Sequence, residues 1–111
     1  MKYLLMICTE EPFDPADHPP AELDAQPWAD EMTRRGIRSF GDRLRPATDA
    51  TTVRVRDGEL LLTDGPFAET KEQMGGIDVI ECADLDEAIE VAAKHPMARL
   101  GMVEVRPFWP M

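Results

Sequence analysis

Cysteine, histidine and aromatic residues are scarce in this chain of 111 residues, which has two cysteines, two histidines and 6% aromatic side chains. Cys8 and Cys82 lie inside apolar runs without the spacing of metal ligands, so we expect neither a disulfide scaffold nor a zinc site. No dinucleotide or phosphate-loop motif is present, and we predict no cofactor. Basic residues are also few, because 12 Lys and Arg stand against 22 Asp and Glu, for a formal net charge of −10. This balance disfavours nucleic acid and anionic membranes as partners.

Long hydrophobic runs are absent as well. The N-terminal apolar stretch Tyr3–Cys8 is six residues long and is followed at once by Thr9 and two glutamates. Such a stretch is shorter than the apolar region of a signal peptide and cannot cross a bilayer, so we expect a cytoplasmic protein. A chain of 111 residues is long enough to fold as one domain without disulfides, and we predict a single domain over residues 1–111.

Charged residues are distributed in blocks along the chain. Residues 10–31 contain eight acidic and no basic side chains, and residues 33–56 contain seven arginines against two aspartates. Residues 57–111 are acidic again, with twelve acids against four bases. Two interpretations are open: acidic and basic faces of two subunits pair with each other, or the charged faces are simply solvated.

The first half of the chain predicts a strand, a helix and a second strand. Lys2–Cys8 is apolar at both parities, as in a strand at the centre of a covered sheet. A helix is expected within Ala21–Arg35. Because a proline suits the first turn of a helix but not its interior, the main helix should begin near Pro27. Trp28 and Met32 then form an apolar pair one turn apart. The second strand is expected at Ile37–Leu44.

The clearest local signal is a β-hairpin over residues 51–63, TTVRVRDGELLLT. Asp57 and Gly58 between two β-rich runs are typical of a two-residue type I′ turn. The register then places Arg56 opposite Glu59, Val55 opposite Leu60 and Val53 opposite Leu62. The four aliphatic side chains share one face of the hairpin, and the arginines share the other.

The second half predicts a strand at Gly76–Cys82, a helix after Asp84 and a last strand at Gly101–Arg106. Glu87 lies three residues after Asp84, as in a capping box. The expected apolar stripe of this helix consists of Leu85, Ala88, Ile89 and Ala92. The apolar tail, residues 107–111, is expected to pack, and we expect Phe108 and Trp109 to make packing or dimer contacts.

The order strand, helix, strand, hairpin, strand, helix, strand indicates an α+β fold. We predict a ferredoxin-like antiparallel sheet with two helices on one face and an inserted β-hairpin. Two short helices cover only one face of such a sheet, so the other face would expose a large apolar patch. We therefore expect a homodimer in which the open sheet faces meet.

The most distinctive stretch is residues 64–76, DGPFAETKEQMGG. We expect residues 64–75 to form a loop that opens with a turn at Asp64, in which Pro66 biases Gly65 to an extended conformation. The two glycines that end the stretch allow the backbone to re-enter the sheet. Loops that are held by strands at both ends often carry function.

This stretch resembles the signature of the DGPF branch of the YCII-related family. The similarity extends to Met1–Cys8, Thr51–Gly76, Ile80–Ala93 and Val103–Pro107. The resemblance implies a dimeric α/β barrel, in which two ferredoxin-like sheets face each other and enclose clefts. It also implies a family without an established general activity, whose members have been suspected to be enzymes or partners of extracytoplasmic-function sigma factors. Some relatives with this fold act on lactones or on chlorinated aromatic breakdown products.

Several residues of the matching segments are candidates for a site. Asp64 and Glu104 are candidate catalytic residues, because a carboxylate in an apolar cleft is suited to proton transfer. Arg106 shares a strand face with Glu104 and would bind an anionic substrate through its guanidinium fork. The other predicted substrate-binding residues lie in the signature stretch: Phe67, Glu69, Lys71 and Glu72.

Each candidate also has a purely structural interpretation. Asp64 could form an Asx-type turn with the amides that follow it. Arg106 could pair with Glu104 or Asp64 and only order the site. The charged residues of the signature stretch could be solvated or could contact a second subunit.

The two histidines do not supply an obvious acid–base group. The wider YCII-related family is associated with a His/Asp pair, but His18 lies in a proline-rich loop and His95 at a helix end, and neither is assigned to that pair. With Lys94, His95 would place positive charge where a helix dipole favours it. His18 beside Asp17 resembles half of a metal site, but no further ligands accompany it, so no metal is predicted.

Two functions from different classes are consistent with the sequence. The first is an enzyme or enzyme-like protein that binds a small molecule in a cleft between the sheet face and the signature loop. The second is a non-catalytic interaction module that docks a transcription regulator, such as an extracytoplasmic-function sigma factor, or another protein. Convergence of Asp64, Glu104 and Arg106 around a cavity would favour the first function. A filled barrel interior, with these groups fully paired to one another, would favour the second.

Overall fold

A computed structural model describes residues 1–66 and 72–110. Within these ranges the larger sheet has four antiparallel strands in the order β2-β5-β1-β6, and β3 and β4 form a separate two-stranded sheet. The strands are β1 (Lys2–Glu10), β2 (Arg38–Arg43), β3 (Thr51–Arg56), β4 (Glu59–Asp64), β5 (Glu72–Glu81) and β6 (Met102–Pro107). The helices are α1 (Pro20–Leu23), α2 (Gln26–Arg34), α3 (Leu85–Ala93) and α4 (Met97–Leu100), with short 3₁₀ turns at Pro15–Asp17 and Ala47–Asp49.

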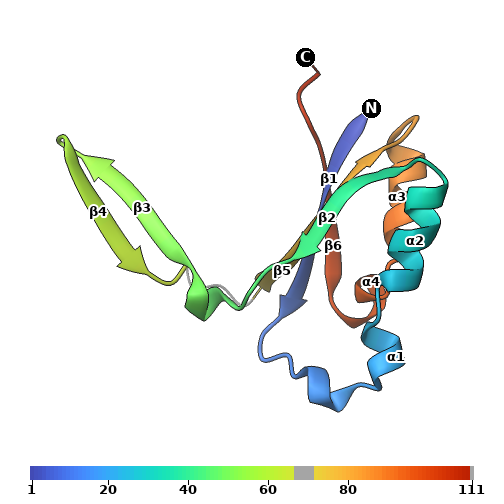
Figure 1. Cartoon of the computed structure of the whole chain (residues 1–111), viewed down its shortest axis with the longest axis horizontal. Coiled ribbons are helices and arrows are strands. Elements are labelled where there is room, and N and C mark those ends of the chain that lie inside the picture. The colour runs from blue at the N-terminus through green and yellow to red at the C-terminus, as the bar shows by residue number, and fades with distance from the viewer. Residues whose placement is uncertain (67–71, 111) are drawn as a thin grey trace.

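Helices α2, α3 and α4 lie on one face of the larger sheet (Figure 1). Strand β1 runs antiparallel to both β5 and β6, and β2 runs antiparallel to β5. The predicted antiparallel α+β fold is therefore confirmed, and the strand order is consistent with a ferredoxin-like arrangement into which β3 and β4 are inserted. The short helices α1 and α4 are additions to the two helices that the sequence predicts.

The hydrophobic core lies between the helices and the sheet. Side chains of β1 alternate between this core and the opposite face of the sheet. Tyr3, Leu5 and Ile7 are buried against the helices, while the residues between them are only partly buried. Ile80 of β5 lies opposite Tyr3 and is fully buried. The prediction of a central strand that is apolar on both faces is confirmed.

Helix α2 carries Pro27 in its first turn, as predicted. A proline costs little there because the first amides of a helix have no intrahelical acceptor. Trp28 and Met32, one turn apart, are both buried. The indole Nε1 of Trp28 donates a 2.9 Å hydrogen bond to the carbonyl oxygen of Val91, which ties α2 to α3.

Helix α3 begins with the predicted cap. The Asp84 carboxylate accepts a 2.9 Å hydrogen bond from the Glu87 amide, and the Glu87 carboxylate accepts a 3.0 Å bond from the Ala83 amide. The predicted apolar stripe is wrong in part: Ala88, Val91 and Ala92 are buried, whereas Leu85 and Ile89 are 49% and 51% exposed. The buried face is narrower because Leu85 and Ile89 lie on a side of α3 that no described element of this chain covers fully.

The C-terminal strand starts at a close approach between two backbones. A Cβ atom on Gly101 would lie 2.3 Å from the carbonyl oxygen of Cys8, so glycine is required there. Beyond β6, the Phe108 amide donates a 3.0 Å hydrogen bond to the carbonyl oxygen of Lys2. Trp109 is nevertheless 92% exposed, so this side chain does not pack within one chain, and its contact with a second subunit stays a prediction.

Strands β3 and β4 form the predicted hairpin, here called the hairpin arm (residues 51–64). Asp57 and Gly58 have φ values of +52° and +78°, which fits a type I′ turn. The predicted register is confirmed: Arg56 lies opposite Glu59, Val55 opposite Leu60 and Val53 opposite Leu62. The arm projects away from the larger sheet on the side opposite the helices (Figure 1).

The connection after the arm is shorter than the predicted loop over residues 64–75. Asp64 is the last residue of β4, and β5 begins at Glu72, whose backbone lies opposite Glu10 of β1. Gly65 has a φ of +97°, a value that glycine adopts more readily than other residues. A 2.7 Å hydrogen bond from the Gly65 amide to the carbonyl oxygen of Ala50 holds it in this conformation.

Candidate functional site

The face of the larger sheet that points away from the helices, here called the open face, has an apolar centre. Leu4 and Met6 of β1 lie on it, directly opposite Val79 and Ile77 of β5. Within one chain these four side chains are only partly buried. Phe40, which lies opposite Val79 on β2, is 57% exposed. The open face is therefore an apolar surface that a single chain does not cover.

Glu104 and Arg106 border this apolar surface on β6. They are two residues apart on one strand face, as predicted, and they form an ion pair. In register they lie opposite Met6 and Leu4. Their side chains are 49% and 66% exposed, so the pair is open to solvent. The prediction that the two residues share a strand face is thus confirmed, and so is the alternative in which Arg106 pairs with Glu104.

Asp64 occupies a different part of the molecule. It ends β4 opposite Thr51, at the base of the hairpin arm, and its side chain is exposed. The turn that follows it is held by Thr52, whose hydroxyl donates a 2.9 Å hydrogen bond to the carbonyl oxygen of Gly65. Within the described part of one chain, the neighbours of Asp64 thus belong to the arm and not to β6.

The remaining predicted site residues lie at or beyond the edge of the described chain. Phe67, Glu69 and Lys71 lie outside the described residues. Glu72 opens β5, and its position is given by its backbone alone. Within the described residues, the candidate site is therefore the open face with Glu104 and Arg106.

A buried ion pair on the helix side of the sheet is the feature that the sequence did not indicate. Arg38 Nε donates a 2.7 Å hydrogen bond to the carboxylate of Asp78, which is 6% exposed. Burial raises the pKa of Asp78, and the hydrogen bond and charge of Arg38 oppose that shift. The signal in the sequence that could have indicated this pair is a single aspartate, Asp78, between Ile77 and Val79 of a predicted strand. Because the pair lies on the face that the helices cover, we assign it to the fold and not to the site.

His95 is also part of the core. It is 4% exposed, its ring meets Trp28 edge-on with centroids 4.7 Å apart, and its Nδ1 accepts a 3.0 Å hydrogen bond from the Met97 amide. Burial lowers the pKa of His95 to about 4. The residue is therefore neutral at pH 7, and the expectation that it supplies positive charge at the helix end is wrong.

His18 packs within the N-terminal connection between β1 and α2. Its ring stacks on Phe13 at 5.4 Å, and its Nδ1 lies 3.7 Å from the Glu22 carboxylate. Among residues 1–66 and 72–110, no three His, Cys, Asp or Glu side chains cluster closely enough to hold a metal ion. In the same ranges, no helix is long and apolar enough to cross a membrane.

The two cysteines differ in their surroundings. Cys8 is partly buried on the open face of β1. Cys82 is buried on the helix side, where burial, and then the negative charge of Glu87, raise the pKa of its thiol to about 11. A thiol with this pKa is almost entirely protonated at pH 7 and is a poor nucleophile.

Comparison with known proteins identifies the family. The YCII-related domain model matches residues 1–111, and the chain belongs to this family. A curated relative from Rhizobium meliloti (strain 1021) is 51% identical over 67 residues, which is 59% of this chain. That relative is itself described as an uncharacterised protein, and the match spans 54% of its length, so about half of it.

Proposed function

We propose that this protein binds a small anionic molecule on the open face, in a cleft that a second copy of the chain closes. Arg106 is the anchor for the anion, and Glu104 is the neighbouring acid or base. The observation that supports the proposal is the solvent-open ion pair of Glu104 and Arg106 beside an apolar surface. A charged anchor next to apolar walls is the usual composition of a small-molecule site.

The exposure of the ion pair makes exchange of partners feasible. An ion pair between exposed side chains contributes about 0–1 kcal/mol, so a ligand carboxylate or phosphate loses little when it displaces Glu104. The guanidinium group of Arg106 can hold either anion through two parallel hydrogen bonds. The displaced Glu104 carboxylate would then be available to accept a proton from the bound molecule.

The second copy would complete the cleft. Leu4, Met6, Ile77 and Val79 remain partly exposed on the open face, and packing of two such faces would remove them from water. Exclusion of water lowers the local dielectric constant and strengthens the attraction between Arg106 and an anion. The homodimer is thus part of the proposed function, since the site is incomplete in one chain.

Asp64 and the signature residues Phe67, Glu69, Lys71 and Glu72 remain predicted site residues. Asp64 is the last residue of the hairpin arm, and the other four residues follow the arm in sequence. The arm projects on the same side of the larger sheet as the open face (Figure 1). In a dimer of facing sheets, the base of the arm can approach the cleft. Asp64 would then be a second acid–base candidate beside Glu104.

A thermal-shift screen of small carboxylic acids, lactones and phosphorylated metabolites tests the proposal. A compound at one hundred times its dissociation constant should stabilise the protein by about 2.7 kcal/mol, which is readily measured. The stabilisation should disappear in Arg106→Ala and persist in Arg99→Ala, a matched control in α4 whose side chain is also exposed. Glu104→Gln should retain binding and lose turnover of any compound that is converted.

A non-catalytic interaction module is the second candidate function. The ion pair of Glu104 and Arg106 favours it, because the two groups are already partnered within the chain. The acidic block of residues 10–31 would then be the surface for a basic partner such as a transcription regulator. The second function replaces the first if two results are found together. No compound in the screen stabilises the protein, and a transcription regulator binds the wild-type chain in a pull-down but does not bind a variant in which the acidic residues of 10–31 are replaced by basic ones.

A further inference from the structure

The hairpin arm exposes more aliphatic surface than an isolated hairpin can support. Val53, Val55, Leu60 and Leu62 share one face of the arm and are each about 60% exposed, between 59% and 64%. Among the described residues, the arm is a sheet of two strands only. A two-stranded hairpin without a further layer is marginally stable in water. Another surface is therefore expected to cover this aliphatic face.

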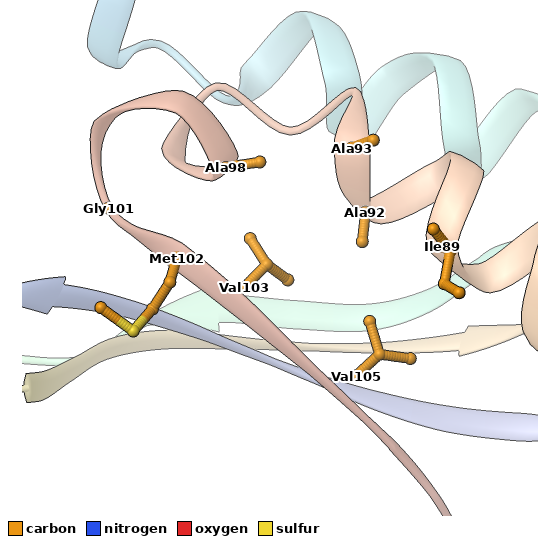
Figure 2. A pocket seen from close by; sticks show the side chains of 8 residues that line it. All are labelled: Ile89, Ala92, Ala93, Ala98, Gly101, Met102, Val103 and Val105. Carbon is orange, nitrogen blue, oxygen red and sulfur yellow. The ribbon is translucent and has the colours of Figure 1, made fainter.

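A groove of suitable chemistry lies between α3 and β6. Val103 and Val105 point from β6 toward Ala92 and Ile89 of α3 (Figure 2). The groove has a volume of about 330 Å³ and is lined by Ile89, Ala92, Ala93, Ala98, Gly101, Met102, Val103 and Val105. Strand β6 is an edge of the larger sheet, and Ile89 is 51% exposed. This α3–β6 groove is therefore open to an occupant from outside.

The arm cannot fill the groove of its own chain. It is inserted between β2 and β5, whereas the groove borders β6 at the opposite edge of the sheet. The arm also projects on the side of the sheet that faces away from α3 (Figure 1). Only the arm of another copy can present this aliphatic face to the groove.

Charge complementarity favours a second copy as the occupant. The face of the arm opposite its aliphatic side chains carries Arg54 and Arg56, which are long enough to reach around the strand edge. The outer side of α3 exposes Asp86 and Glu90 beside Ile89. Opposite charges would thus meet at the rim while apolar side chains fill the centre, which is the usual arrangement of an interface.

We propose that the aliphatic face of the hairpin arm of one copy docks into the α3–β6 groove of a second copy, and that two such contacts clasp the dimer. The inference rests on the dimer of the proposed function but concerns a different surface. It assigns an occupant to the arm and to the groove at the same time.

Cross-linking between two differently tagged chains tests the contact. One chain carries Leu62→Cys and the other Ile89→Cys, both in a Cys8→Ser background, and Cys82 remains because it is buried. The chains are co-expressed, treated with a short bismaleimide and separated on a denaturing gel. We expect a product that contains both tags. The matched control is Leu61→Cys, on the opposite face of the same strand, which should yield several-fold less product.

The outcome separates this inference from the proposed function. The docking of the arm is overturned if Leu62→Cys and Leu61→Cys give equal yields of cross-linked product. It is also overturned if Leu62→Cys and Ile89→Cys give no product in a sample that light scattering shows to be dimeric. Either result leaves the open-face dimer standing. A mass of one chain, 12.5 kDa, in the wild-type sample would overturn both.

Discussion

The carboxylate of Asp78 on β5 accepts a 2.7 Å hydrogen bond from Nε of Arg38 on β2, across the strand pair that closes one edge of the larger sheet. The pair has room because Gly41 lies opposite Asp78 and has no side chain. Arg38 also donates a 2.9 Å hydrogen bond from its second nitrogen to the carbonyl oxygen of Gly41. Arg38 and Gly41 of β2 thus form one partly buried polar unit with Asp78 of β5 on the helix side of the sheet.

Gly41→Ala should destabilise the protein by about 3 kcal/mol, the usual cost of breaking a buried ion pair. A Cβ atom at this position would lie 1.8 Å from the Asp78 carboxylate oxygen, so the carboxylate would have to leave Arg38. Urea unfolding provides the measurement. Gly75→Ala is the matched control, since its Cβ would meet nothing closer than 3.9 Å and should change stability by less than about 1 kcal/mol. Equal midpoints for the two variants would contradict the structural role of Gly41.

The stability of the protein should fall as the pH drops from about 6.5 to about 4, because of His95. Its pKa is lowered from 6.5 to about 4 in the folded chain, so the unfolded chain binds a proton in this range before the folded chain does. The contribution is fully present above pH 6.5 and, when completely lost, amounts to about 3 kcal/mol. Urea unfolding at several pH values measures it.

His95→Asn is the control for that pH dependence. Asparagine can retain an acceptor for the Met97 amide but does not titrate. The variant should lose less stability than the wild type between pH 6.5 and pH 4. Parallel pH curves for the two proteins would show that His95 is not the group responsible.

Cys82 should resist alkylation in the folded protein. A thiol pKa of about 11 instead of 9 lowers the thiolate fraction at pH 8 about a hundredfold, and burial restricts access further. Iodoacetamide treatment followed by peptide mass spectrometry should find Cys82 unmodified in buffer and modified in urea. Glu87→Gln, which keeps an acceptor for the Ala83 amide but removes the charge, should make Cys82 react faster. Rapid modification of Cys82 in the folded wild type would contradict its placement in the core.

Met6→Glu should convert the proposed dimer into monomers without unfolding the chain. Met6 lies on the open face, between Ile77 and Glu104 in register, and a carboxylate there would be buried opposite the like-charged Glu104 in a dimer of facing sheets. Light scattering should give about twice 12.5 kDa for the wild type and 12.5 kDa for the variant. Thr33→Glu, on the exposed side of α2, is the control and should stay dimeric. A dimeric Met6→Glu protein would place the interface elsewhere.

The features that the sequence predicted well depend on neighbours along the chain. Asp57 and Gly58 determine the type I′ turn and, with it, the register of the whole arm. The strand period of two residues is sufficient to place Glu104 and Arg106 on one face. Likewise, Asp84 and Glu87 cap α3 through hydrogen bonds between residues that are three and four positions apart in sequence.

The features that were missed depend on segments that are distant in sequence. Arg38 and Asp78 are 40 residues apart, and their contact requires β2 and β5 to be neighbours in one register. The stripe on α3 looked continuous from its spacing, but the position of α3 above β6 decides that Ile89 is half exposed and Val91 buried. The displacement of Asp64 from Glu104 likewise follows from the direction of the arm, which no local pattern specifies.

The sequence by itself determined the antiparallel α+β class, the turn of the arm, the cap of α3 and the family. These follow from local propensities, two- and four-residue periods and a long signature, all of which are written in consecutive residues. Only the tertiary structure decided that Asp78 and His95 are core groups, that Glu104 and Arg106 stand together at the border of the open face, and that Asp64 stands apart from them. Burial and long-range pairing set those outcomes, and both depend on which strands become neighbours.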